Sequence, residues 1–188
     1  MTSILETAPA LRYRAAAQAF VELIEGRGRT SPAEWLAQVH MRLPELYAAA
    51  LALGEVEPAT SEANPRAMSQ EEWASVYADI CGVLGKWNYY WLVFDPYIDS
   101  DREAVCGSVA DDLADIYRDL RDGLENVKSV GKVRPNNVFW EWRSDFRSHW
   151  AAHATGALRA LSTAFFVYHA RELPESFGSE ASISPIAS

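Results

Sequence analysis

The sequence contains little cysteine, only Cys81 and Cys106 among 188 residues. Two isolated cysteines cannot form a disulfide framework or supply the ligand spacing of a structural zinc site. We therefore expect two reduced, buried thiols in a protein of the cytoplasm. Residues 1–9 show no basic segment followed by an apolar one, so no secretion signal is predicted.

Long hydrophobic runs are also lacking. Even the longest, from Leu46 to Leu53, has only eight residues, whereas a membrane-spanning helix needs about 20 apolar residues. No membrane association is expected. The sequence also has no glycine-rich phosphate loop and no serine or cysteine nucleophile motif, so nothing favours nucleophilic catalysis. On these grounds a non-enzymatic role is favoured, and an enzymatic role is kept as the alternative.

Positive charge is scarce, with 17 Lys and Arg against 26 Asp and Glu and a net charge of −9. Ten of the carboxylates lie between Asp95 and Glu125, where only three arginines oppose them. Such a surface repels nucleic acid and anionic lipid, and suits a basic protein partner or a cation. We expect Asp111, Asp115 and Asp122 to face solvent, either as an interaction face or simply as a solvated acidic face.

What the sequence does contain is helical periodicity, with no clear alternation typical of strands. It predicts an all-α protein, an up-and-down bundle of about five helices in a single domain over residues 1–173, followed by a disordered tail at 174–188. Ser31 and Ser69 are expected to cap the second and third helices. The last helix, about Asn137 to Leu173, is the longest, and its apolar stripe predicts the wall against which the other helices pack: Phe139, Phe146, Trp150, Ala157, Leu161, Ala164 and Tyr168.

Aromatic residues are concentrated between Lys86 and Phe94. Because Trp and Tyr dominate the energetics of protein interfaces, Trp87, Tyr90 and Trp91 are candidate interface anchors. The interpretation that the sequence favours, however, is a short helix or turn folded over the end of the bundle.

Acidic and histidine side chains recur every four residues in the last helix, at Glu141, Asp145, His149 and His153. Two histidines four residues apart on a helix can bind one divalent metal ion, with carboxylates of a neighbouring helix completing the shell. Asp112 and Asp119, at the margin of the fourth helix, are the candidate carboxylates. The Glu-x-x-His pair of ferritin-like di-iron proteins and the His-Glu-x-x-His motif of metalloproteases are both absent.

The interpretation that the sequence favours for the same residues is a structural polar layer without metal. In that interpretation a ring N–H of His153 donates a hydrogen bond to a carboxylate or carbonyl of the next helix. Arg143, which falls on the apolar face, pairs with Asp112 or Asp119.

Two stretches carry a family resemblance: residues 111–120, DDLADIYRDL, and the segment from Phe146 through His149-Trp150 and His153 to Leu161. Over about Ala10 to Leu173 the chain resembles a family of bacterial all-helical proteins known as domain of unknown function number five-zero-six-three. The resemblance implies a helical bundle in a bacterial cytoplasm and implies no catalytic residue.

Taken together, the residues favour a cytoplasmic interaction or accessory protein with an acidic face. The alternative is a metal-binding protein or metal-dependent hydrolase that uses His149, His153 and the aspartates of the fourth helix. A protein partner and a divalent metal ion are therefore the two ligands to look for.

Overall fold

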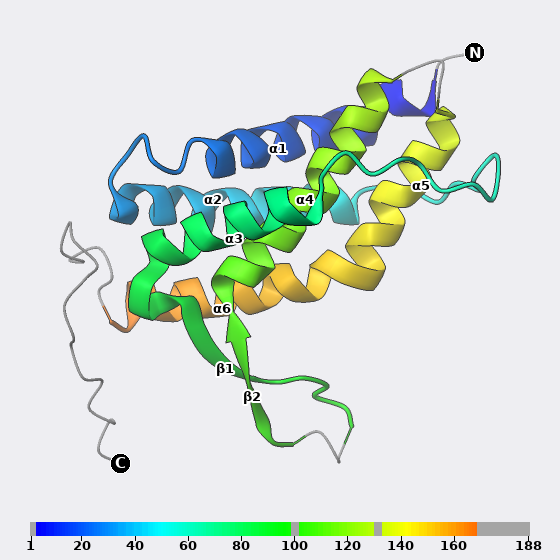
Figure 1. Cartoon of the computed structure of the whole chain (residues 1–188). Coiled ribbons are helices and arrows are strands. Elements are labelled where there is room, and N and C mark those ends of the chain that lie inside the picture. Colours follow the sequence, from blue (N-terminus) through cyan, green and yellow to red (C-terminus); the bar gives the residue numbers. More distant parts are fainter. Residues whose placement is uncertain (1–2, 99–101, 130–132, 169–188) are drawn as a thin grey trace.

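The chain folds into the predicted all-α bundle with a long carboxyl-terminal helical segment (Figure 1). The computed structural model describes residues 3–98, 102–129 and 133–168, so the expected tail at 174–188 lies outside the described residues. The helices are α1 (Ala8–Glu25), α2 (Pro32–Leu51), α3 (Gln70–Leu84), α4 (Val109–Lys128), α5 (Pro135–Asp145) and α6 (Ala151–Phe166). Short 3₁₀ turns at Ile4–Glu6 and Gly85–Asn88 precede α1 and follow α3.

Two of these helices begin with the predicted serine caps, each as part of a capping box. The Ser31 hydroxyl accepts from the backbone N–H of Glu34, whose carboxylate accepts from the Ser31 N–H. Ser69 and Glu72 make the same exchange at the start of α3. Each box satisfies backbone donors that the first helical turn leaves unpaired.

The centre of the bundle is α4, which packs against α1, α3, α5 and α6. Fourteen of its twenty residues are buried, so helices cover it on several sides. The final helical segment packs against α4, but α4 rather than the final helix, which the apolar stripe predicted, is the element around which the others pack.

The final helical segment differs from a single straight helix. Between α5 and α6 the residues Phe146–Trp150 form a π-helical turn, in which the Ala151 N–H bonds to the Phe146 carbonyl. The two helices meet there at a visible bend (Figure 1). Six residues of the predicted apolar stripe are buried, whereas Tyr168 is 49% exposed.

The segment from Lys86 to Phe94, predicted as a short helix or turn, begins in the 3₁₀ turn Gly85–Asn88. It then continues, contrary to that prediction, as the first strand of a β-hairpin that projects from the bundle (Figure 1). Strand β1 (Tyr89–Val93) pairs antiparallel with β2 (Ala104–Ser108), with Tyr90 opposite Gly107. Exposed and half-buried residues alternate along β1. Every residue of that strand is apolar or aromatic, so the alternation of its two faces was invisible in the sequence.

Within residues 3–98, 102–129 and 133–168, no helix has the length and apolar character that a membrane span requires.

Candidate metal centre

Two histidines on the final helical segment face α4. His149 belongs to the π-helical turn and His153 to the first turn of α6, and their ring centroids lie 5.0 Å apart at an interplanar angle of 77°. A π-turn contains one more residue than an α-turn and often occurs at functional sites. Here it holds His149.

Each histidine is held by an aspartate of α4. Nδ1 of His149 lies 2.6 Å from Oδ2 of Asp119, and Nδ1 of His153 lies 2.8 Å from Oδ1 of Asp112. An ionised carboxylate only accepts hydrogen bonds, so each Nδ1 carries the donated proton. In the neutral ring the lone pair is then on Nε2, the tautomer that a metal ion requires.

The two Nε2 atoms converge on one carboxylate oxygen. Oδ2 of Asp115 lies 3.8 Å from Nε2 of His149 and 3.7 Å from Nε2 of His153. The other oxygen of Asp115 accepts from Arg118 at 2.7 Å, which fixes the orientation of the carboxylate. One possible ligand atom from each of Asp115, His149 and His153 lies within 4.8 Å of the other two.

The supporting shell extends to the hairpin and to the loop before α3. The Tyr90 hydroxyl donates to Oδ2 of Asp112 at 2.7 Å. Nη1 of Arg66 lies 3.7 Å from Oδ1 of Asp119. The side chains of Asp115 and His149 are 13% and 37% exposed, so the centre lies at the protein surface and is accessible to solvent.

The environment perturbs the titration of these groups. The hydrogen bond to Asp112 raises the pKa of His153, because that carboxylate stabilises the imidazolium. Burial raises the pKa of Asp112 despite its bonds to His153 and Tyr90. Burial, reinforced by the charges of Asp119 and Glu141, raises the pKa of Asp145 to about 7.

Comparison with known proteins adds the family. A family model described as a domain of unknown function, DUF5063, matches residues 7–167. The chain belongs to this family. The crystal structure of protein BF1032 from Bacteroides fragilis is similar, with a TM-score of 0.75 and 17% sequence identity over 87% of this chain and 96% of that one. At this identity the likeness shows that the fold is shared, and no curated protein matches the chain.

Within this member of DUF5063, the structure brings together four of the predicted site residues: His149, His153, Asp112 and Asp119. Arg143 is not among them, because its guanidinium pairs with Glu55 at 2.6 Å. The expected pairing of Arg143 with Asp112 or Asp119 is therefore wrong.

Asp115 was expected to face solvent, and it is instead the residue toward which both histidines point. A signal existed in the sequence, since Asp112, Asp115 and Asp119 follow the three- and four-residue spacing of one helical edge. A helical-wheel projection of α4 alone places Asp115 on the solvent side. In the folded protein the two histidines of the final helical segment lie over this edge of α4 and reach Asp115.

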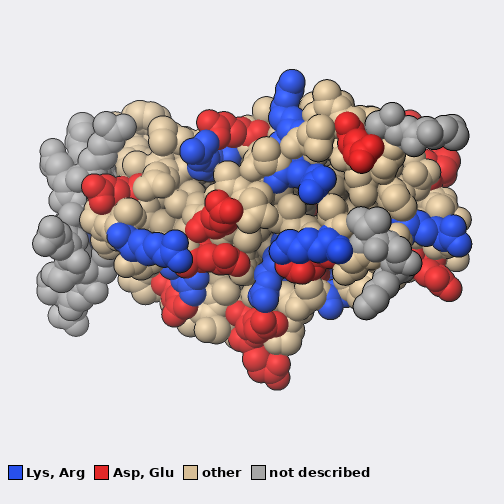
Figure 2. All heavy atoms as spheres, turned by 90° about the horizontal axis from the view of Figure 1, so that it is seen from above, with Lys and Arg blue, Asp and Glu red and all other residues tan. Residues whose placement is uncertain are grey.

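The expected acidic face is also different in the structure. Asp122 is buried, because it accepts the backbone N–H groups of Ala67 and Met68 at 2.7 and 3.1 Å. Asp111 and Asp115 are half-buried. On the face seen from above, acidic and basic side chains are interspersed (Figure 2).

The three candidate interface aromatics have separate environments. Trp87 is half-buried, with its ring 5.6 Å from that of Tyr168, and the Tyr90 hydroxyl is hydrogen-bonded to Asp112. Trp91, on the other face of β1, is 68% exposed. Of the three, only Trp91 is available to a partner in the way the sequence suggested.

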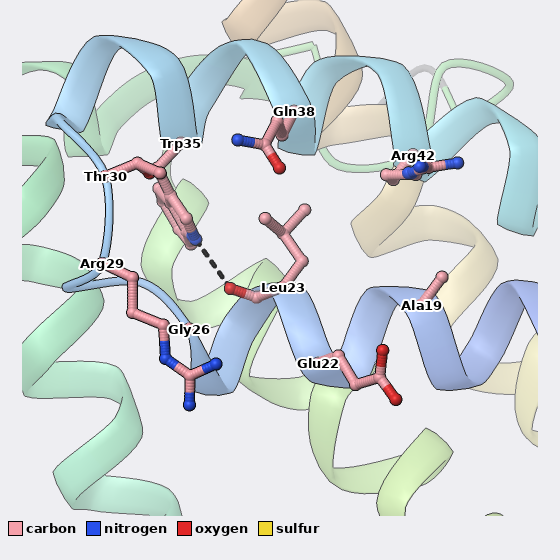
Figure 3. A pocket seen from close by; sticks show the side chains of 9 residues that line it. All are labelled: Ala19, Glu22, Leu23, Gly26, Arg29, Thr30, Trp35, Gln38 and Arg42. Carbon is pink, nitrogen blue, oxygen red and sulfur yellow. Dashed lines mark hydrogen bonds between the residues drawn. The ribbon is translucent and has the colours of Figure 1, made fainter.

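A cavity of about 310 Å³ lies elsewhere, between α1 and α2 (Figure 3). The Trp35 indole donates to the Leu23 carbonyl at 2.9 Å across it. Its polar lining includes Glu22, Arg29 and Arg42 and none of the residues of the histidine–aspartate cluster.

Proposed function

We propose that this protein binds a divalent transition-metal ion through Asp115, His149 and His153. The observation that carries the proposal is the convergence of two histidine Nε2 atoms on Oδ2 of Asp115 at 3.7 and 3.8 Å. These distances are too long for hydrogen bonds. They are close to the separation of about 3.4 Å between neighbouring ligand atoms around a tetrahedral Zn²⁺ with bonds of about 2.1 Å.

The outer shell supports the same proposal. Metal-binding histidines usually donate their second ring N–H to a carboxylate or carbonyl, which fixes the tautomer and raises ligand basicity. Asp119 and Asp112 accept these two protons. Nitrogen and carboxylate ligands suit Zn²⁺, Fe²⁺ and Mn²⁺, so these are the metal ions to test first.

Three protein ligands leave at least one coordination position for water or a substrate. That arrangement is typical of catalytic rather than structural zinc, and a metal ion there would lower the pKa of a bound water. The partial exposure of His149 favours access of such a ligand. Metal-dependent hydrolysis is accordingly the reaction class that such a site would support.

The proposal is tested by calorimetric titration of chelator-treated protein with Zn²⁺, Mn²⁺ and Fe²⁺, alongside melting temperatures with and without each metal ion. One-to-one binding that stabilises the wild type, and that His149→Ala and His153→Ala abolish, is the expected result. His40→Ala serves as the matched control, because His40 contacts Ser162 on the opposite part of α6 from this cluster. No binding by the wild type would leave a structural polar layer as the correct interpretation.

An interaction role is the second candidate, favoured by the outer face of the hairpin. Tyr89 and Trp91 are 63% and 68% exposed there, and exposed aromatic residues of this kind are typical of protein interfaces. A photoreactive amino acid at position 91 should then crosslink to a protein partner in cells. The same amino acid at Met41, 61% exposed on α2, should not.

A further inference from the structure

The hairpin reaches the candidate metal centre through Tyr90. Its hydroxyl donates to Oδ2 of Asp112 at 2.7 Å, while Oδ1 of the same carboxylate accepts from His153 at 2.8 Å. One carboxylate therefore holds a strand of the hairpin with one oxygen and a candidate metal ligand with the other.

The position of the Tyr90 ring is also fixed by shape. The ring lies between Gly107 on β2 and Gly156 on α6. A Cβ atom at position 107 would lie 2.7 Å from Cζ of Tyr90, and one at position 156 would overlap the Tyr90 hydroxyl. Because neither neighbour has a side chain, the ring can lie close to α6 with its hydroxyl directed at Asp112.

We propose that Tyr90 is a positioning residue of the metal centre, so that docking of the hairpin on α6 and metal affinity are linked. This inference rests on the proposed metal binding. With its hydroxyl in place, the Asp112 carboxylate is held at both oxygens and keeps His153 in the tautomer whose Nε2 is free to bind a metal ion. Without it, one oxygen of Asp112 loses its partner and the carboxylate can rotate away from His153.

Linkage makes this effect reciprocal. If hairpin docking raises metal affinity by some factor, a bound metal ion favours the docked hairpin by the same factor. A molecule that lifted the hairpin from α6 would weaken metal binding, and one that pressed it onto α6 would strengthen it.

The test compares Zn²⁺ affinity by calorimetry in the full-length wild type, Tyr90→Phe and Tyr89→Phe. Loss of a residue that hydrogen-bonds directly to a metal ligand typically weakens metal binding by about 10–100-fold. Tyr90 bonds to such a residue, Asp112, and not to a ligand, so we expect Tyr90→Phe to weaken Zn²⁺ binding by about 5–10-fold. Tyr89→Phe removes a hydroxyl from the exposed face of the same strand and should leave the affinity unchanged. Gly156→Ala keeps the hydroxyl but displaces the ring, and should weaken binding in the same direction.

Hydrogen exchange supplies a second readout that a purely structural role would not change. Backbone amides of β1 and β2 should exchange more slowly in the wild type with Zn²⁺ than without it, and this metal-induced protection should shrink in Tyr90→Phe. If Tyr90→Phe fails to fold, the Zn²⁺ affinity of Gly156→Ala and the metal-induced amide protection of the wild type still test the linkage.

The two proposals fail in distinguishable ways. A wild type that binds Zn²⁺, with equal affinity in Tyr90→Phe and unchanged hairpin exchange, overturns the linkage and leaves metal binding intact. A wild type that does not bind Zn²⁺, Mn²⁺ or Fe²⁺ overturns both.

Discussion

His153 and Asp112 are 41 positions apart in the chain, and Nδ1 of the first lies 2.8 Å from Oδ1 of the second. The neighbouring pair, His149 and Asp119, makes the same kind of contact, with the earlier histidine bonded to the later aspartate. Asp115 lies between the two aspartates in the sequence and between the two imidazoles in space. This arrangement gives the following predictions.

Replacing Asp112 by asparagine should weaken metal binding without removing a ligand. The amide keeps the shape of the side chain but loses the negative charge that fixes the His153 tautomer, and loss of such a partner typically costs about 10–100-fold in metal affinity. Calorimetric titration with Zn²⁺ measures the change. Glu125→Gln, which removes only a surface pairing with Lys128 on the same helix, is the control. Equal affinities in Asp112→Asn and the wild type would show that Asp112 does not support the site.

Metal affinity should fall as the pH is lowered, and the fall should begin above pH 6.5. Protons and metal ions compete for Nε2 of His153, whose pKa is raised by its hydrogen bond to Asp112. Zn²⁺ titrations between pH 6 and 8.5 in a non-coordinating buffer would show the decline, about tenfold per pH unit for each proton displaced. An affinity independent of pH over this range would contradict the assignment.

Protonation of His153, which should weaken metal binding, should stabilise the fold of the metal-free protein. Because the pKa of His153 is raised in the folded state, protonation of His153 stabilises the fold fully below pH 6.5, and this stabilisation is lost as the pH rises through the raised pKa. His153→Gln should therefore lower the free energy of unfolding more at pH 5.5 than at pH 8.5. A loss of equal size at both pH values in urea titrations would argue against a charged His153–Asp112 pair.

Asp145 should destabilise the protein at neutral and alkaline pH. Its pKa is about 7 in the folded protein against 3.8 for a free side chain, so the folded state binds the proton more tightly and stability falls as the pH rises between these values. Asp145→Asn should resemble the wild type near pH 4 and exceed it at pH 8, by on the order of a few kcal/mol. Urea unfolding at both pH values is the measurement, with the exposed Glu45→Gln as control. Parallel pH profiles for Asp145→Asn and the wild type would contradict it.

Two glycines in helices should respond oppositely to alanine. A Cβ at Gly123 on α4 would lie 2.7 Å from Cδ1 of the buried Trp142 and overlap its Nε1, so Gly123→Ala should destabilise by about 1–2 kcal/mol despite the better helix propensity. Gly82 on α3 faces open space, and Gly82→Ala should stabilise by about 0.5–1 kcal/mol. Thermal and urea unfolding of both variants would decide the matter, and a shift in the same direction for both would count against this account of the α4–α5 contact.

The sequence by itself determined the helices and several of their starts. Apolar residues at helical spacing mark one buried stripe per helix, and capping by Ser31 and Ser69 depends only on residues three positions away. The same local periodicity placed Asp112, Asp119, His149 and His153 near the margins of helices that pack together. These features could be predicted because the interactions that produce them span no more than one or two helical turns.

The tertiary structure decided which side chains meet. Asp122 and Arg143 have partners, Met68 and Glu55, that lie 54 and 88 positions away, and no local pattern specifies contacts over such separations. The inner and outer faces of the all-apolar strand β1 are distinguished only by tertiary contacts. On the inner face, the Tyr90 ring packs against Gly107 and Gly156, which have no side chain to exclude it. Asp115 becomes a candidate ligand because the π-helical turn and the crossing of α4 by α6 bring both imidazoles to it. Helical periodicity follows from the backbone geometry of each segment, whereas these contacts depend on how the folded helices pack against one another.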